Sequence, residues 1–332
     1  MSRIELIATA TFGLEAVVAR EVKELGYDDM TVENARVIFA GDESAVCRAN
    51  LWLRTADRVL VKMGEFRALT FEELFEQTKA LPWPDWIPEN AAFPVQGKSV
   101  KSRLYSVPDC QAIVKKAVVE KMKMRYKREW FEETGPRYVI EVALLKDTAT
   151  LTIDTSGAGL HKRGYRRLGS RAPLKETLAA AMILLSRWHP DRVLIDPFCG
   201  SGAIPIEAAL IGMNIAPGLK REFASGGWPN IPKSLWVKAR EEALDLASPN
   251  LNLRVFGSDI DGEALSLARY HARQAGVEEK IFFQKLAVNE LRSKYKYGYI
   301  ICNPPYGERL GDMREVERLY REMGTVFKAL DT

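Results

Sequence analysis

The sequence predicts an α+β N-terminal half and a C-terminal half that is a parallel, doubly wound α/β sheet. From Leu174 onward, helical and strand patterns alternate, which is typical of a parallel sheet with helices on both faces. Three apolar strands in this half each end in a distinctive motif: DPFCGSG at Asp196–Gly202, FGSDID at Phe256–Asp261 and NPPYG at Asn303–Gly307. The 332 residues are enough for two or three domains.

The N-terminal half begins with a strand, helix and strand pattern that runs to about residue 41. Apolar residues recur there at helical spacing, and Gly26 suits the end of that helix. Further elements follow along the chain. We expect helices at Ala45–Leu53, Phe71–Leu81 and Asp109–Arg128, an irregular Pro- and Trp-rich connection at Leu81–Pro94, paired strands at Tyr138–Leu145 and Thr148–Asp154, and a linker at Gly157–Gly169.

Composition limits the function classes. The net charge is +4 and the pI about 8.7, which permits a polyanionic partner without demanding one. The sequence has neither an apolar run of membrane-spanning length nor a signal-peptide pattern. Four cysteines lack the spacing of a metal site, and three histidines make triad chemistry a poor expectation. We therefore expect a cytoplasmic protein with no metal and no membrane partner.

The first motif predicts a ligand site at a strand end. A glycine-rich turn between a strand and a helix brings backbone N–H groups and a helix N-terminus close to a ligand. Gly200 and Gly202 permit positive φ and close approach, so we expect them to contact the ligand together with Asp196 and Phe198. Asp196 has two interpretations: a contact to the ligand's ammonium group, or a cap of the turn.

The second motif supplies the next candidates. Asp259, with Ile260 beside it, ends a strand where an acid usually accepts ribose hydroxyls. Asp261 is interpreted as the N-cap of the helix that follows. Asp259 lies much farther beyond Gly202 than the usual distance of about 20 residues. The additional segment, Met213–Asn250, is either a substrate lid or a packed excursion, and the sequence does not decide between them.

The third motif points to chemistry on a base. An exocyclic amino group is a poor nucleophile, because its lone pair is conjugated with the ring. Asn303 and a backbone carbonyl of Pro304 or Pro305 can accept its two N–H bonds, and Tyr306 offers a face for a base taken out of its stack. The ordered triple of motifs resembles the class I S-adenosylmethionine-dependent methyltransferases, which implies S-adenosylmethionine as cofactor. Asn303 would then also line the cofactor site.

Basic residues suggest how a nucleic acid would be held. We expect phosphate contacts from two groups of cations, one on the helix at Asp109–Arg128 and one in the linker, although a solvated charged surface is the alternative in both places. The candidates are Lys115, Lys121, Arg125 and Arg128 on the helix, and Lys162, Arg163 and Arg166 in the linker.

Nearly the whole chain resembles the bacterial THUMP-domain RNA methyltransferases, in particular those that methylate the guanosine N2 amino group in 23S rRNA. The matching stretches are ATATFGLEAVVAREVKELGY, SRLYSVPDCQAIVKKAVVEKM, DTSGAGLHKRGYR, APLKETLAAA, DPFCGSGAIPIEAA, NIAPGL, GSDID and NPPYGERL. The resemblance implies a ferredoxin-like part at residues 1–60, a THUMP RNA-binding domain at 61–156, a linker at 157–172 and a Rossmann-like methyltransferase domain at 173–332. It also implies a structured RNA partner, with 23S rRNA as first choice and tRNA as second.

Two departures from the family pattern qualify this expectation. Ala287 stands where relatives commonly carry an acid that contacts the cofactor's adenine. The family's catalytic domain also continues with further strands beyond the helix that we expect at Glu315–Ala329, which implies that this chain, ending at Thr332, is a fragment. Two alternatives therefore stay open: an adenine-N6 methyltransferase acting on RNA or DNA, and an RNA-binding protein without catalytic activity.

Overall fold

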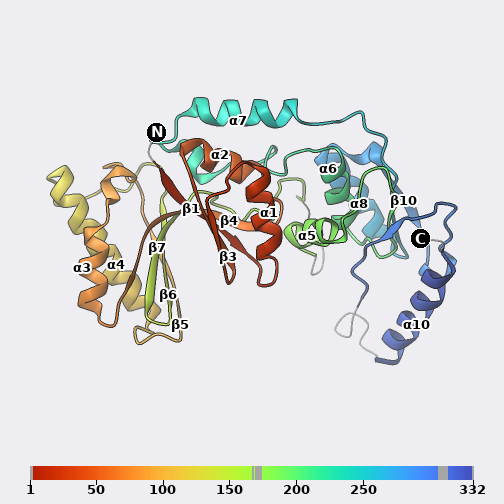
Figure 1. Cartoon of the computed structure of the whole chain (residues 1–332), viewed down its shortest axis with the longest axis horizontal. Coiled ribbons are helices and arrows are strands. Elements are labelled where there is room, and N and C mark those ends of the chain that lie inside the picture. Colours follow the sequence, from red (N-terminus) through yellow and green to blue (C-terminus); the bar gives the residue numbers. More distant parts are fainter. Residues whose placement is uncertain (1–2, 167, 169–173, 306–312, 331–332) are drawn as a thin grey trace. The chain divides into compact units, whose positions relative to one another are not determined.

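The chain forms two compact units, and each is described here by itself. The computed structural model describes residues 3–166, 168, 174–305 and 313–330. Unit 1 comprises residues 1–160 together with 222–241, and unit 2 comprises residues 161–221 and 242–332. The sequence-based domain division kept residues 173–332 together, whereas residues 222–241 pack with the N-terminal unit (Figure 1).

Unit 1 is built on a seven-stranded sheet with strand order β2-β3-β1-β4-β7-β6-β5 among its described residues. The strands are β1 (Ile4–Ala10), β2 (Met30–Glu33), β3 (Arg36–Gly41), β4 (Ala56–Arg67), β5 (Val95–Val100), β6 (Val139–Leu145) and β7 (Thr148–Asp154). The long strand β4 pairs with β1 on one side and with β7 on the other, so it joins the first and last strands into one sheet. Edge strand β5 runs parallel to β6.

The helices of unit 1 agree with the predicted positions. They are α1 (Glu15–Glu24), α2 (Glu43–Trp52), α3 (Phe71–Ala80) and α4 (Val107–Tyr126). Gly26, with φ of +90°, follows α1 as expected. Three apolar side chains of α4 are fully buried: Val114, Val118 and Met122. Strands β4 and β5 were not predicted, whereas β6 and β7 lie where the sequence placed paired strands.

The segment between the first and second motifs is packed rather than free to act as a lid. The Trp228 ring stacks on Tyr138 with 4.1 Å between ring centroids, and its Nε1–H donates to the Arg137 carbonyl at 3.1 Å. Trp228 is buried, and the backbone N–H of Ser225 donates to the Thr155 carbonyl at 3.1 Å. The segment around Trp228 therefore forms part of the core of unit 1.

Unit 2 holds a parallel sheet of four strands in its described part, with order β10-β9-β8-β11. The strands are β8 (Leu194–Asp196), β9 (Val255–Asp259), β10 (Ile281–Lys285) and β11 (Tyr299–Ile300), and the helices are α5 (Glu176–Ser186), α6 (Ala203–Gly212), α8 (Gly262–Ala275) and α10 (Met313–Ala329). Helix α7 (Lys233–Asp245) begins in the segment assigned to unit 1. In the described part of the chain, every helix is too short or too polar to cross a bilayer.

Candidate active site

Three sequence motifs meet at the carboxyl edge of the unit 2 sheet. Strand β8 ends at Asp196, its neighbour β9 ends at Asp259, and β11 on the other side of β8 leads into Asn303. The register aligns Ile195 with Ile300, so Asn303 lies a few residues beyond the end of β8. The chain order of the strands reverses between β8 and β11, and parallel sheets bind ligands at such a switch point.

The glycine turn is fixed by hydrogen bonds from several elements. The Cys199 N–H donates to the Ser258 carbonyl at 2.9 Å, and the Gly200 N–H donates to Asp259 Oδ2 at 2.9 Å. On the opposite side, Nδ1 of His271 lies 3.2 Å from the Ser201 carbonyl. His271 is fully buried, and burial lowers its pKa, so the neutral ring donates through Nδ1–H. The turn is thus held before any ligand arrives.

The two glycines of the turn have different roles. Gly202 has φ of +87°, and a Cβ there would lie 3.1 Å from Cβ of Ala268, so this glycine permits the close packing of α6 on α8. Gly200 has φ of +49°, and a Cβ there would meet nothing within 4 Å among the described residues. Gly200 therefore borders open space at the strand ends, as a backbone cradle for a ligand requires.

Asp196 is a buried carboxyl without an ion-pair partner among the described residues. It is 1% exposed, and its Oδ1 accepts the Phe198 N–H at 3.1 Å. Burial, together with the nearby charge of Asp259, raises its pKa to about 8. A cationic group placed beside it would favour the ionised form. This arrangement fits both earlier interpretations, because the carboxyl caps the turn and retains acceptor capacity for an ammonium.

Asp259 is half-buried and only partly engaged. Its Oδ1 accepts the Asp261 N–H at 3.0 Å and its Oδ2 accepts the Gly200 N–H, which leaves lone pairs for a ligand's hydroxyl groups. The side chain of the adjacent Ile260 is 69% exposed at this strand end. Asp261 caps α8, as predicted, by accepting the Glu263 N–H at 2.8 Å.

The third motif is partly described. Asn303, Pro304 and Pro305 are half-buried. Burial, with a contribution from the charge of Asp196, raises the pKa of the preceding Cys302 to about 12. The predicted stacking residue, Tyr306, lies outside the described residues.

Ala287, where the family pattern has an acid, follows β10 next to the same edge. The preceding Leu286 N–H donates to the Asp259 carbonyl at 3.1 Å. The carboxylate of Glu290 lies 3.4 Å from the Ala287 backbone nitrogen. Glu290 thereby caps the short 3₁₀ turn Val288–Glu290.

The predicted phosphate contacts on α4 are only partly available. The Nζ of Lys115 pairs with Glu133 and lies 3.5 Å from the Phe93 ring centroid. Arg128 pairs with Glu89. In the described part of unit 1, the side chains of Lys121 and Arg125 make no ion pair or hydrogen bond; Lys121 is half-exposed and Arg125 is exposed.

The predicted contact from Arg163 in the linker is wrong. Its guanidinium side chain is 2% exposed and pairs with Glu207 on α6 at 3.4 Å. The Tyr165 hydroxyl donates to the same carboxylate at 3.1 Å. Arg166 is largely buried and pairs with Glu176 at 3.3 Å, whereas Lys162 is exposed. Arg163 and Arg166 therefore fasten the linker to helices of unit 2, and Lys162 is the linker candidate that lies at the surface.

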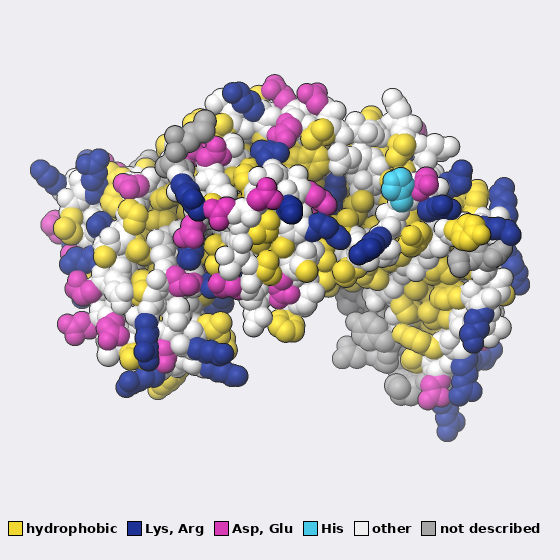
Figure 2. Space-filling view, in the orientation of Figure 1, with side chains coloured by type: hydrophobic (Ala, Val, Ile, Leu, Met, Phe, Trp, Pro, Cys, Tyr) yellow, Lys and Arg dark blue, Asp and Glu magenta, His cyan; other side chains and the backbone are white. Residues whose placement is uncertain are grey.

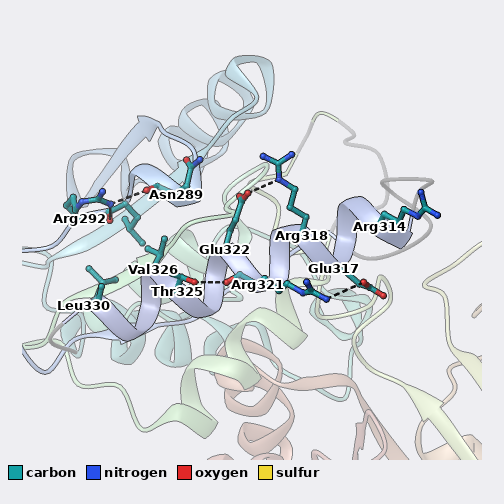
Figure 3. A pocket seen from close by; sticks show the side chains of 12 residues that line it. Asn289, Arg292, Arg314, Glu317, Arg318, Arg321, Glu322, Thr325, Val326 and Leu330 are labelled. Atoms are coloured by element: carbon teal, nitrogen blue, oxygen red, sulfur yellow. Dashed lines mark hydrogen bonds and ion pairs between the residues drawn. The ribbon is translucent and has the colours of Figure 1, made fainter.

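A pocket of about 670 Å³ is lined by residues outside the three motifs, and Figure 3 shows these lining side chains. Its wall is formed by α10 and the segment around Arg292, and none of the predicted site residues lines it. Its charges are largely compensated, because Arg318 pairs with Glu322 at 3.0 Å and Arg321 with Glu317 at 3.9 Å. This pocket gives no support for a second ligand site.

Comparison with family models covers most of the chain. Residues 163–331 match the RMKL-like methyltransferase domain, residues 5–60 match the RlmL ferredoxin-like domain, and residues 68–154 match the THUMP domain. The chain belongs to the RMKL-like methyltransferase family. These matches confirm the predicted fold class, with a ferredoxin-like part, a THUMP domain and a class I methyltransferase domain.

Two curated relatives of this methyltransferase match over nearly its whole length. It is 55% identical to the putative RNA methyltransferase YpsC of Bacillus subtilis, covering 100% of this chain and 86% of YpsC. It is 34% identical to the ribosomal RNA large subunit methyltransferase K/L of Photobacterium profundum, covering 98% of this chain and 46% of that protein.

Solved structures of similar proteins share the fold closely. A predicted N6-adenine-specific DNA methylase from Listeria monocytogenes is 57% identical, with a TM-score of 0.96 over 99% of this chain and 87% of its own. SMU.472, a putative methyltransferase crystallised with S-adenosylhomocysteine, is 45% identical, with a TM-score of 0.94 over 99% of this chain and 87% of its own.

Proposed function

We propose that this methyltransferase transfers a methyl group from S-adenosylmethionine to the exocyclic N2 amino group of a guanosine in structured RNA, most directly in 23S rRNA. The observation that carries the proposal is the meeting of Asp196, Asp259 and Asn303 at one carboxyl edge, on either side of a strand-order switch. Two acids and a glycine turn suit the cofactor, and the Asn-Pro-Pro segment beside them suits an amino group.

The cofactor is S-adenosylmethionine, as the family and the S-adenosylhomocysteine complex of SMU.472 support. When bound, it supplies an electrophilic methyl group on a sulfonium with a neutral leaving group. The chain's residues fit its parts: Asp196 would accept from the ammonium, Asp259 would accept from the ribose hydroxyls, and Ile260, which is exposed, would cover one adenine face. Gly200 borders open space at these strand ends, and Phe198, two residues earlier in the turn, is half-buried.

Positioning is the main contribution of the protein to the transfer step. Because the leaving group is neutral, the step needs little acid–base assistance and depends on how the amino group is held. The Asn303 side-chain carbonyl and a backbone carbonyl of the Pro pair accept its two N–H bonds, which aims the nitrogen lone pair. The rigid Pro304-Pro305 segment fixes these acceptors relative to β11. Tyr306 as the stacking face remains a sequence-based prediction.

The choice of RNA rests on the domain content and the relatives. The chain carries a THUMP domain, YpsC is named a putative RNA methyltransferase, and the K/L relative is named for large-subunit ribosomal RNA. These names support RNA as substrate and favour 23S rRNA over tRNA. The guanosine N2 atom is chosen through the family resemblance, since an Asn-Pro-Pro-Tyr segment serves both guanine and adenine amino groups.

The test compares substrates with one enzyme preparation. The full chain is incubated with methyl-labelled S-adenosylmethionine and, separately, protein-free 23S rRNA, total tRNA and double-stranded DNA. We expect label in 23S rRNA and negligible label in DNA. Label confined to DNA would exclude an RNA methyltransferase. Label in tRNA alone would identify tRNA, the second choice, as the substrate. Absence of S-adenosylhomocysteine binding by calorimetry would favour the non-catalytic RNA-binding alternative.

A further inference from the structure

We propose that unpaired RNA binds to unit 1 at a basic and aromatic loop surface, which we name the β5 platform. Its members are Lys101, Arg103 and Tyr105, in the loop between β5 and α4, and Lys146 in the turn between β6 and β7. The inference rests on the proposed RNA substrate and names where that RNA is held. Figure 2 shows Lys and Arg side chains beside hydrophobic ones where β5 and β6 end in Figure 1.

Backbone hydrogen bonds hold the two segments of the platform together. The Lys146 N–H donates to the Val100 carbonyl at 3.1 Å, and the Arg103 N–H donates to Asp147 Oδ1 at 2.7 Å. The Asp147 N–H donates to the Ser102 hydroxyl oxygen at 3.0 Å. The platform is therefore a pre-formed surface, and its side chains need little ordering of the backbone before a ligand binds.

The fold holds the Tyr105 side chain at the surface. The side chain of its neighbour Leu104 is buried, and the Leu104 carbonyl accepts from the Ser99 hydroxyl at 2.7 Å, which anchors the loop from below. Tyr105 itself is 82% exposed, with Val100 at 51% and Leu145 at 53%. An aromatic face fixed at this exposure offers a base a stacking surface.

The cations beside Tyr105 are available for phosphates. Lys101, Arg103 and Lys146 are exposed, and no hydrogen bond or ion pair engages their side chains within the described residues. One oxygen of the Asp147 carboxylate accepts the backbone N–H of Arg103. Free positive charge around an exposed aromatic ring is the combination that single-stranded nucleic acids recognise, through phosphates and stacking together.

The end of α4 is the competing surface, where Lys121 and Arg125 have no ion-pair partner among the described residues but two other cations are compensated. Trp130 is also exposed there, at 79%. However, Lys123 pairs with Glu129 at 3.0 Å and with Glu120 at 3.4 Å, and Arg128 pairs with Glu89. An RNA phosphate at this end would have to displace carboxylates, which lowers the gain from each contact. The observations therefore favour the β5 platform.

The test compares two matched double variants, each losing one Lys and one Arg. Lys101→Gln/Arg103→Gln alters the platform, and Lys121→Gln/Arg125→Gln alters α4. Affinity for protein-free 23S rRNA is measured at several salt concentrations, with a 12-nucleotide oligouridylate and a paired RNA duplex of that length as competitors. We expect the platform variant to lower the log–log salt slope by about 1.4, or about 0.7 per phosphate contact. The α4 variant should keep the wild-type slope, and the oligouridylate should compete better than the duplex.

Tyr105 variants test the stacking part. Tyr105→Ala should weaken binding about 5- to 150-fold with an unchanged salt slope, and Tyr105→Phe should keep most of the affinity. All variants should bind S-adenosylhomocysteine like the wild type, because no change touches unit 2. Unchanged RNA affinity in both platform variants, loss confined to the α4 variant, or better competition by the duplex would overturn the proposal.

The same measurements separate this proposal from the proposed function. If the wild type methylates 23S rRNA while the platform variants bind it normally, the platform is wrong and the function stands. If the wild type methylates no RNA but the platform variants lose RNA affinity, the platform stands and the function is wrong. A protein partner at the platform would appear as normal binding of naked RNA by every platform variant, and this would also overturn the proposal.

Discussion

Asp259 at the end of β9 accepts the backbone N–H of Gly200 in the glycine turn after β8, with 2.9 Å between Oδ2 and the nitrogen. The acid predicted as a ligand of the ribose therefore also fixes the turn predicted to cradle the cofactor. Two motifs that are distant in the sequence form one rigid edge through this bond, and a change at Asp259 affects both.

Substitution of Asp259 should separate these two roles. Asp259→Ala removes the ribose acceptor and the turn anchor, so affinity for S-adenosylhomocysteine should fall about tenfold or more, from 1.5–3 kcal/mol per charged hydrogen bond. Asp259→Asn leaves one of two backbone N–H groups, of Gly200 or of Asp261, without an acceptor, so it should lower the melting temperature less than Asp259→Ala does and give intermediate affinity. Calorimetric titration and thermal denaturation measure both. Wild-type affinity in Asp259→Ala would remove this residue from the site.

Asp196 should make the stability of the ligand-free protein depend on pH. Its pKa is about 8 in the folded protein against an ordinary value of 3.8, so the unfolded chain releases this proton at a lower pH. The folded state binds more protons between these values, and its stability relative to Asp196→Asn should fall as the pH rises from about 4 to 8 and then level off. Urea denaturation of both proteins between pH 5 and 9 tests this. A pH-independent difference between them would contradict it.

His271 should act as a positioning residue for the glycine turn. Its Nδ1 lies 3.2 Å from the Ser201 carbonyl, and it is not one of the residues predicted to contact the cofactor. His271→Leu leaves a carbonyl without its donor and should weaken S-adenosylhomocysteine binding by a loss of about 1–3 kcal/mol, whereas Asn places a donor at the Nδ1 position and should restore most of the affinity. If Leu and Asn variants lose affinity equally, or if neither does, the Nδ1–H bond does not position the turn.

Arg163 should matter for folding and not for RNA. Arg163→Gln leaves the Glu207 carboxylate buried without its cation, which should cost about 3–5 kcal/mol of stability. The paired replacement Arg163→Met/Glu207→Leu should recover much of that loss, because no isolated charge remains. The salt dependence of RNA binding should be that of the wild type in the paired variant. A lower log–log salt slope in the paired variant would show that Arg163 contacts RNA.

The motif positions were predictable because local chemistry fixes them. A glycine turn after an apolar strand and an acid that caps a helix are local arrangements, and Gly202 and Asp261 adopt them as expected. Strand β4 was missed, since its pattern becomes clear only when β1 and β7 supply its two neighbours. The ion pair of Arg163 could not be predicted either. A basic run in a sequence is usually a solvated surface, and the partner of Arg163 is Glu207 from a later helix.

The packing of Trp228 on Tyr138 shows the same limit at longer range. The sequence of Met213–Asn250 was equally compatible with a lid. Only the ring of Tyr138, which lies far from Trp228 in the sequence, assigns the part around Trp228 to the core of unit 1. Free and paired cations on α4 were likewise indistinguishable in sequence, because Glu89 and Glu133 lie outside the helix that they neutralise.

The most direct test of the central claim is nucleoside mass spectrometry of protein-free 23S rRNA after reaction with methyl-labelled S-adenosylmethionine, using wild type and Asn303→Ala. We predict N2-methylguanosine from the wild type. We predict a rate about 10²–10³-fold lower for the variant, because it lacks one preorganised acceptor for the amino group. Its S-adenosylhomocysteine affinity should be close to that of the wild type. N6-methyladenosine as the product, or full activity of Asn303→Ala, would contradict the account.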